Sequence, residues 1–360
     1  MKEIVHSKPW ITDAENSAVS DLMATGMLAQ GKKVREFECA MGGWIGARDG
    51  AVAVGSGSAA IVLALDALGV RGGDEVVLPS YICPKVFEAV ATVGARPVLC
   101  DMGDYWIVRS HNVEPCITSR TKALIVPHLY GIFTDTESFH RLGVPIIEDF
   151  AQAMGPKGNR SLRSGDIAVF SFHPTKLLTT GEGGMAVSAD QDLVRRMRAI
   201  RDGSENRDRG RLFSPMSDIS GVLGLSQLNR YPTFLARRRA MAKRYTVALK
   251  DILPGGFDEY PFERSMFFRF PLRLEGGITK YRPLFAERGI RVSSGVDELL
   301  HRCMKLSDDQ FRTSALLYER TVSLPIYPAM TESEQDRCVQ AAVEIFSKYA
   351  IGQRLAHSAQ

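Results

Sequence analysis

The chain has 360 residues and carries 45 Lys and Arg against 41 Asp and Glu, a formal net charge of +4. This length allows a large core and favours two domains, and so balanced a charge, without a long basic run, argues against nucleic-acid binding. The first residues form no apolar signal region and no run of about 18 apolar residues occurs, so we expect a cytoplasmic protein outside the membrane. The six cysteines form no Cys-x-x-Cys pair and lie near no His cluster, so neither a metal site nor a disulfide framework is predicted.

The first half of the chain alternates between predicted helices and predicted strands. A helix over residues 11–28 opens with Thr12 and Glu15, which have the spacing of a capping box. Further helices are predicted over residues 59–68 and 86–93. The predicted strands cover residues 51–54, 76–78, 96–100, 123–127 and 145–148. This alternation predicts an α/β fold built on an open, largely parallel sheet.

A glycine-rich turn, Gly55-Ser56-Gly57-Ser58, joins the first of these strands to the next helix. A helix N-terminus that follows such a turn presents unpaired N–H groups, which makes it a candidate anion site. The turn also fits Gly-x-Gly-x-x-Ala, a weak dinucleotide fingerprint that expects an acid at the end of the following strand. Asp74 and Glu75 lie near the required distance but precede that strand, so a phosphate site is the interpretation that remains.

The most informative stretch, residues 145–187, contains an acid, Asp149, and a lysine, Lys176, each just after a predicted strand. The predicted strand over residues 145–148 leads directly into Asp149, and the next apolar run, residues 167–172, contains Ser171 and leads to Lys176. Pyridoxal phosphate requires an amine for a Schiff base, an acid for its pyridine nitrogen and donors for its phosphate. Lys176, Asp149 and Ser171 are candidates for these three roles. The alternative is that the lysine lies on the surface and the aspartate caps a helix.

Sequence motifs that carry a family resemblance are spread over nearly the whole chain. The most specific are IIEDFAQAMG (146–155), GDIAVFSFHPTK (165–176) and TTGEGG (179–184). They are accompanied by VAVGSGSAA (52–60), GGDEVVLPSY (72–81), PHLYG (127–131), RRRAMAKRY (237–245) and SLPIYPAMTESE (323–334). In this order the motifs resemble those of the DegT/StrS-type family of pyridoxal-phosphate sugar aminotransferases.

The resemblance implies a fold-type-I transferase with two domains. Residues 1–240 would form a large cofactor-binding domain around a mostly parallel central sheet, and residues 241–360 would form a smaller α+β domain. In the second half of the chain we predict helices over residues 219–228, 230–253, 280–288 and 331–348, and strands over residues 266–274 and from 289 to 292.

The same resemblance assigns roles to individual residues. Lys176 would hold the cofactor and move the proton during transamination, and Asp149 would keep the pyridine nitrogen protonated. Gln152 would contact the 3′-oxygen of the cofactor. Further cofactor contacts are expected from Gly57, Ser58, Ala59, Ser171 and His173.

Four further residues are candidates for contacts with the cofactor ring or the substrate. The position that stacks on the cofactor ring falls on Cys83, for which a simple core role is the alternative. Tyr81, two residues earlier, is a substrate-site candidate. His128 ends one predicted strand, where it either lines the site or fills the strand end. His301 matches a family position near the substrate.

One family motif is missing. The Asn-x-Arg-Met sequence, whose Asn reaches the phosphate site of the partner subunit, is replaced here by residues 213–218, FSPMSD. The polar segment over residues 202–215 is predicted to be a mobile loop. Either Ser214 or a loop arginine is a candidate replacement for the lost contact.

The function implied by the resemblance is transfer of an amino group from glutamate or glutamine to a nucleotide-linked keto-sugar, in amino-sugar biosynthesis for a polysaccharide or antibiotic. The expected assembly is a homodimer with its sites at the interface. One alternative is a dehydratase or lyase on the same cofactor, although the family members that dehydrate sugars carry His in place of Lys176. The other is a non-catalytic regulatory or binding protein that kept the fold.

Overall fold

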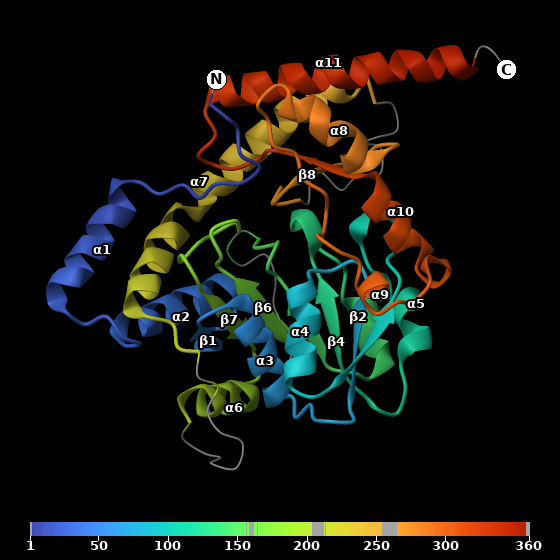
Figure 1. Cartoon of the computed structure of the whole chain (residues 1–360). Coiled ribbons are helices and arrows are strands. Elements are labelled where there is room, and N and C mark those ends of the chain that lie inside the picture. The colour runs from blue at the N-terminus through green and yellow to red at the C-terminus, as the bar shows by residue number, and fades with distance from the viewer. Residues whose placement is uncertain are drawn as a thin grey trace.

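The computed structural model of this chain describes residues 2–155, 157, 162–163, 165–203, 212, 214–253 and 265–357, with side chains up to residue 348. The fold is α/β, as predicted: a large, mostly parallel sheet is flanked by helices, and a smaller α+β part lies beside it (Figure 1). Most of the loop predicted over residues 202–215 lies outside the described residues.

The large sheet has seven strands within the described residues, in the order β1-β7-β6-β5-β4-β2-β3. In chain order these are β1 (Ala51–Val54), β2 (Glu75–Pro79), β3 (Arg96–Cys100), β4 (Thr121–Pro127), β5 (Ile146–Asp149), β6 (Ile167–Ser171) and β7 (Gly184–Val187). Neighbouring strands are parallel, except that β7 runs antiparallel to both β1 and β6. The C-terminal ends of β2, β4, β5 and β6 therefore lie along one edge of the sheet.

Helices cover both faces of this sheet. On one face lie α3 (Gly57–Ala67), α4 (Pro84–Thr92) and α6 (Gln191–Asp202), and on the other lie α2 (Lys32–Ile45) and α7 (Asp218–Leu249). Val52 of β1 packs in the first layer, whereas its neighbour Ala53 packs in the second. Burial on both faces explains why the strands are almost continuously apolar instead of alternating with polar residues.

The helix α7 is continuous, although we predicted two helices over residues 219–228 and 230–253. Pro232 lies inside α7 and removes one N–H donor. The helix continues because Tyr231 and Phe234, on either side of this proline, are buried in the core. The predicted domain division falls within α7, which runs from the large sheet to the smaller part of the chain (Figure 1).

The helix α1 (Asp13–Thr25) begins with the predicted capping box, in which the backbone N–H of Thr12 donates to Glu15 Oε2 at 2.8 Å. Arg230 of α7 donates to the same carboxylate at 2.7 Å. Burial alone would raise the pKa of Glu15, but hydrogen bonds from Thr12 and Arg230 outweigh it and lower that pKa to about 2. A buried carboxylate thus ties α1 to α7.

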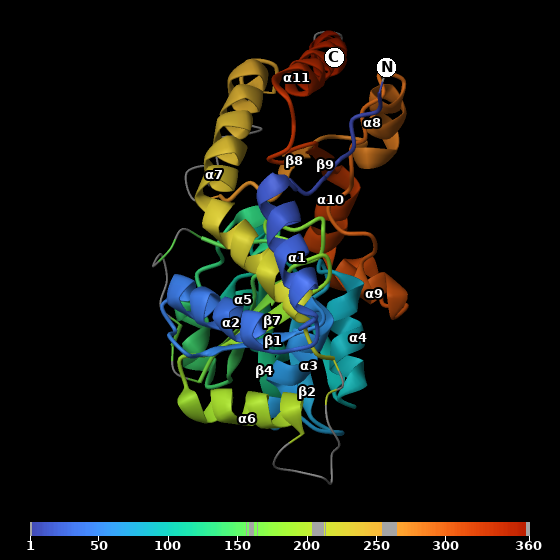
Figure 2. The same ribbon diagram turned by 90° about the vertical axis from the view of Figure 1, so that its left-hand side faces the viewer.

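The smaller part is built on an antiparallel pair, β8 (Phe270–Arg273) and β9 (Thr321–Leu324). It also contains α8 (Gly277–Ala286), α10 (Arg312–Arg320) and α11 (Glu332–His357). The strand predicted over residues 266–274 is shorter than expected. The strand expected from residue 289 is reduced to single bridges, of which one joins Ile290 to Ile4. The N-terminal segment therefore extends from α1 to the smaller part (Figure 2).

Short elements connect the larger ones. They are the helices α5 (Ser110–Val113) and α9 (Leu300–Cys303) and the 3₁₀ turns Asp104–Trp106, Glu114–Cys116, Leu129–Gly131, Glu137–Leu142 and Asp308–Gln310. Within the described part of the chain, no helix is both long and apolar enough to cross a membrane.

Candidate active site

A cavity of about 550 Å³ lies at the C-terminal ends of β5 and β6, where the sheet edge meets residues of the smaller part. In open α/β sheets this edge is where ligands bind. Most of the residues predicted to bind a cofactor line this cavity: Gly57, Ser58, Cys83, Asp149, Gln152, Ser171, His173 and Lys176. The loop after β2, the N-terminus of α3 and the ends of two core strands are thus brought together around one space.

The N-terminus of α3 is pressed against the ends of β6 and β7. A Cβ atom added to Gly57 would lie 2.8 Å from Cβ of Ser171, and one added to Gly184 would lie 2.1 Å from the carbonyl oxygen of Ser56. Only glycine allows this approach. It places the first N–H groups of the helix, at Gly57 and Ser58, next to the Ser171 hydroxyl at the cavity wall. Such a set of donors forms a cradle for a phosphate.

Asp149 is the last residue of β5 and is 7% exposed. Its Oδ1 accepts a hydrogen bond from the backbone N–H of Ala151 at 2.9 Å, which fixes the carboxyl group in the cavity wall. Burial raises the pKa of Asp149, and the nearby charge of Lys176 opposes that rise. A cationic N–H group that enters the cavity and bonds with the Asp149 carboxylate would therefore stabilise its ionised form.

Lys176 follows β6 through a turn in which its backbone N–H donates to the carbonyl oxygen of His173 at 2.8 Å. Its Nζ lies over the ring of Phe268, 5.4 Å from the centroid. Burial lowers the pKa of Lys176, while the attraction of Asp149 acts in the opposite direction. A lowered pKa increases the neutral fraction of the amine, which is the form that attacks a carbonyl carbon.

Three further predicted residues occupy the walls of the same cavity. Oε1 of Gln152 accepts the backbone N–H of Tyr130 at 2.9 Å, so the orientation of the amide is fixed and its Nε2 is the group left to donate to a ligand. Cys83 is exposed at the start of α4. His173 is exposed as well, and its Nδ1 lies 2.9 Å from the Thr175 hydroxyl.

These residues fit pyridoxal phosphate. The cradle at α3 suits its phosphate, the Asp149 carboxylate suits its pyridine nitrogen, and the Lys176 amine suits its carbonyl carbon. The glycines at 57 and 184 leave the space that the cradle needs. The cavity thus combines an amine, a carboxyl group and a set of phosphate donors, the three groups named above for this cofactor.

Comparison with known proteins agrees with this chemistry. Residues 9–343 match the model of the DegT/DnrJ/EryC1/StrS aminotransferase family. The chain belongs to this family. The predicted resemblance and the predicted enzyme class, an aminotransferase, are both confirmed.

Solved structures of other aminotransferases have the same fold. TlmJ, an aminotransferase from Streptoalloteichus hindustanus, is 27% identical, with a TM-score of 0.85 over 95% of this chain and 98% of that one. DesV from S. venezuelae, solved with a ketimine intermediate, is 27% identical, with a TM-score of 0.83 over 93% and 94% of the two chains. The pyridoxal-phosphate form of Spr1654 from Streptococcus pneumoniae, a putative sugar aminotransferase, is 25% identical, with a TM-score of 0.85 over 97% and 99%.

Three residues predicted to contact the cofactor or the substrate are not among the residues that line the cavity: Ala59, Tyr81 and His128. Ala59 is buried in α3, and its N–H is used by the Ser56 side chain that caps the helix, at 3.1 Å. The Tyr81 hydroxyl is buried 2.8 Å from that of Tyr130, and burial raises the pKa of Tyr81 to about 12. His128 is also fully buried, where its Nε2 lies 3.0 Å from a carboxylate oxygen of Glu148.

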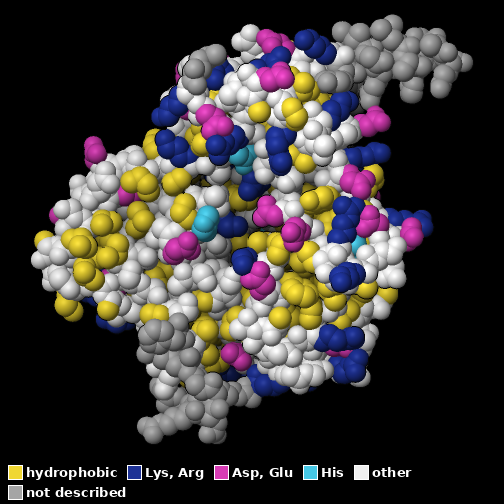
Figure 3. Space-filling view, viewed as in Figure 1, with side chains coloured by type: hydrophobic (Ala, Val, Ile, Leu, Met, Phe, Trp, Pro, Cys, Tyr) yellow, Lys and Arg dark blue, Asp and Glu magenta, His cyan; other side chains and the backbone are white. Residues whose placement is uncertain are grey.

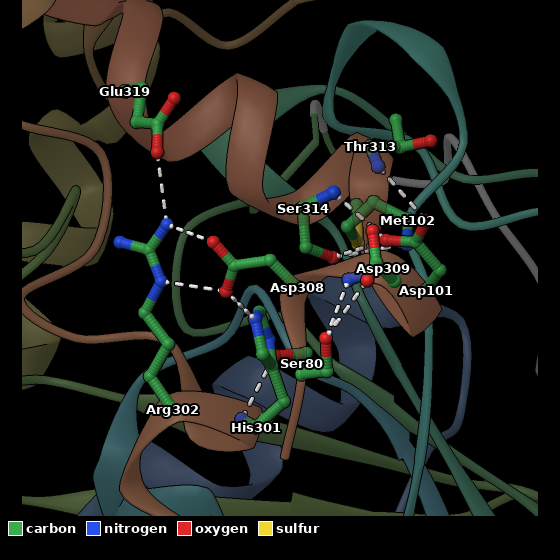
Figure 4. Close-up of polar contacts among 11 residues, drawn as sticks. Ser80, Asp101, Met102, His301, Arg302, Asp308, Asp309, Thr313, Ser314 and Glu319 are labelled. Carbon is green, nitrogen blue, oxygen red and sulfur yellow. Dashed lines mark hydrogen bonds and ion pairs between the residues drawn. The ribbon is translucent and has the colours of Figure 1, made fainter. Parts of the chain in front are cut away.

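His301 does not line the cavity either. Its side chain is buried, and it belongs to a polar network that also includes Ser80 and the partly exposed Asp308 and Arg302 (Figure 4). Its Nε2 donates to Asp308 at 2.9 Å, because that carboxylate can only accept. Its Nδ1 lies 2.5 Å from the Ser80 hydroxyl. Arg302 donates to the same Asp308 at 2.7 Å. This network fixes the start of the loop that carries Cys83, so the position of His301 supports the site through Ser80.

Several cavity residues were not anticipated from the sequence. They come from the segment before β8 and from the loop after residue 292, and they are Phe268, Arg269, Ser293, Gly295, Val296 and Asp297. The segment before β8 was predicted as an ordinary strand, and no local motif marks either segment. An arginine inside a run of buried aromatic residues, SMFFRF (265–270), was the one available signal.

Proposed function

We propose that this protein transfers the amino group of an amino acid, glutamate or glutamine, to a nucleotide-linked keto-sugar, with pyridoxal phosphate as its cofactor. The observation that carries the proposal is the position of Asp149 and Lys176 in one cavity, beside a phosphate cradle at the N-terminus of α3. Neither a lysine on the surface nor a capping aspartate would need that arrangement.

When bound, pyridoxal phosphate supplies an electron sink for the charge that develops when the Cα proton is removed. Lys176 provides the amine to which the cofactor is attached. The Nζ of Lys176 would also serve as the base that accepts the Cα proton of the donor, a role that the lowered pKa of this amine favours. Asp149 holds a proton at the pyridine nitrogen, and the buried surroundings strengthen that contact.

The proposed acceptor is supported by the family and by the size of the cavity. At about 550 Å³ the cavity is of the size of typical sites for small molecules, about 300–1,000 Å³. A solved relative, Spr1654, is described as a putative sugar aminotransferase. The presence of lysine at position 176 argues against the dehydratase alternative, because the amine that transamination requires is retained.

The proposed homodimer is supported by an apolar surface. Figure 3 shows apolar side chains gathered over α1. Ile11, Met23 and Met27, in and beside this helix, are 44%, 51% and 71% exposed. A second copy of the chain covering this surface would bury them, and two-fold dimers are the commonest oligomers. Sedimentation should give a dimer, and a monomer at assay concentrations would contradict this part of the proposal.

Covalent trapping of the cofactor tests the central assignment. The purified protein mixed with pyridoxal phosphate should become yellow, and borohydride should then fix the cofactor to Lys176. Digestion and mass spectrometry should locate the adduct on the peptide that contains this residue. The Lys176→Ala variant is the control and should give no adduct. An adduct on a different lysine of the wild type would refute the assignment.

A further inference from the structure

Arg269 presents a cation in the wall of the active-site cavity. Within the described part of the chain, its guanidinium forms no ion pair with a carboxylate. Asp297 also lines the cavity, and its carboxylate attracts the Arg269 guanidinium only through longer-range electrostatics. An arginine at the edge of a buried cavity usually has an acidic partner, because an uncompensated charge there is costly. The missing partner indicates that an anion binds there.

His6 holds Arg269 in place without neutralising its charge. Arg269 Nη1 donates to Nδ1 of His6 at 2.5 Å, and His6 Nε2 lies 3.0 Å from the Ser323 hydroxyl. Nδ1 therefore accepts, and the ring proton lies on Nε2. Burial and the neighbouring Arg269 lower the pKa of His6, so the imidazole is neutral. The N-terminal segment and β9 together thus position a guanidinium that keeps its full charge.

The geometry relates Arg269 to Lys176. Both cations lie over the ring of Phe268: Nζ of Lys176 is 5.4 Å and Cζ of Arg269 is 5.1 Å from its centroid. An amino donor must bring its amino group to the cofactor carbon that Lys176 serves. Its α-carboxylate is bonded to the same carbon atom as that amino group, so it reaches only a short distance farther. A guanidinium matches a carboxylate with two parallel hydrogen bonds.

We propose that Arg269 binds the α-carboxylate of the amino donor and that His6 positions Arg269 for this contact. The inference rests on the proposed aminotransferase function and adds a residue that selects the donor. It also gives the N-terminal segment, which is far from the cofactor motifs in the chain, a role in substrate binding.

The test compares donors with analogues that lack the α-carboxylate. L-Glutamate is paired with 4-aminobutanoate, and L-glutamine with 4-aminobutanamide. The Kd of each donor is measured from the change in cofactor absorbance in the first half-reaction, and the Ki of each analogue from its inhibition of that change. In the Arg269→Gln variant the Kd of the active donor should rise about 10- to 100-fold, the range for losing a charge-assisted contact. The Ki of the analogue should change less than about threefold.

Two further variants separate this contact from a general disturbance. Arg273→Gln is the matched control, because Arg273 belongs to β8 but stacks on Tyr105 at 4.1 Å, away from the cavity. It should leave every constant unchanged. His6→Ala should raise the Kd of the donor in the wild type but add nothing in the Arg269→Gln background, as expected of a residue that acts through Arg269.

The outcomes are distinguishable. Equal weakening of the donor and of its analogue would show that Arg269 contacts another part of the donor and would overturn the inference. So would unchanged donor binding accompanied by weaker binding of dTDP or UDP, which would assign Arg269 to the diphosphate of the acceptor. If the wild type shows no absorbance change with any common amino acid, the aminotransferase proposal itself fails, independently of Arg269.

Discussion

Replacement of Asp149 by Asn should remove most transamination while preserving the fold. Asn retains the oxygen that accepts the Ala151 N–H at 2.9 Å, so the local geometry is kept. What is lost is the negative charge, and with it the proton on the pyridine nitrogen. The substitution is therefore a test of charge at a fixed position.

The magnitude follows from the burial of this carboxyl group. Asp149 is only 7% exposed, so water does not screen its contact with the cofactor. Loss of a preorganised electrostatic contact of this kind costs about 10²- to 10³-fold in rate, or about 3–4 kcal/mol. Stability should behave differently. The pKa of Asp149 is raised by burial, so the ionised group costs stability at neutral pH, and the Asn variant should melt at the same or a higher temperature.

The assay is the single-turnover reaction of the reconstituted enzyme with its amino donor, followed by cofactor absorbance. Thermal melting and cofactor titration are measured on the same samples. Asp166→Asn is the matched control: Asp166 is a buried aspartate at the other end of the sheet, and it bonds with His140 at 2.7 Å. It should leave the rate within about threefold. If Asp149→Asn also stayed within threefold of wild type while binding the cofactor, the assignment of Asp149 to the pyridine nitrogen would be wrong.

Two further predictions concern the cradle and the capping carboxylate. Gly57→Val should weaken pyridoxal phosphate binding at least about tenfold in a fluorescence titration, because its Cβ would lie 2.8 Å from Cβ of Ser171. Gly43→Ala, where a Cβ meets nothing within 4 Å, should bind normally, and equal affinities for both variants would contradict the cradle. Glu15→Gln should lower the free energy of unfolding in urea at pH 7 by up to about 3 kcal/mol. A depressed pKa contributes stability above the unfolded pKa of 4.5, so this loss should shrink as the pH falls from 4.5 towards 2. A loss that stayed constant down to pH 2.5 would show that charge is not its cause.

The local order of residues along the chain was sufficient to predict much of the fold and the residues at the centre of the candidate site. The strands β1 and β3 were predicted at their observed bounds. For β1 the reason is a continuous apolar run between turns, which is typical of a strand buried on both faces. Asp149 and Ser171 end neighbouring parallel strands, so their proximity follows once a parallel sheet is inferred. Their roles toward the cofactor remain predictions for the experiments above.

Other features depend on contacts between distant segments, which no local pattern encodes. The predicted break in α7 is absent because buried packing outweighs one lost hydrogen bond at Pro232. The sequence left open whether His128 lines the site or fills the strand end, and His301 was a substrate-site candidate by resemblance; each side chain is fully buried next to an acidic partner. A histidine next to a motif can serve either purpose, and only its three-dimensional surroundings decide between them.

Arg269 is the opposite case: it lines the cavity, but no sequence pattern marked it as a site residue. It lies in an apolar segment with no motif. Its partner His6 and the Ser323 hydroxyl that His6 contacts are each more than 50 residues away in the sequence, on opposite sides. The sequence alone determined the family, the α/β fold and the residues at the ends of the core strands, because these depend on short-range order along the chain. The tertiary structure decided which charges face the cavity unpaired, because pairing depends on folding together the N-terminal segment, the sheet edge and β9.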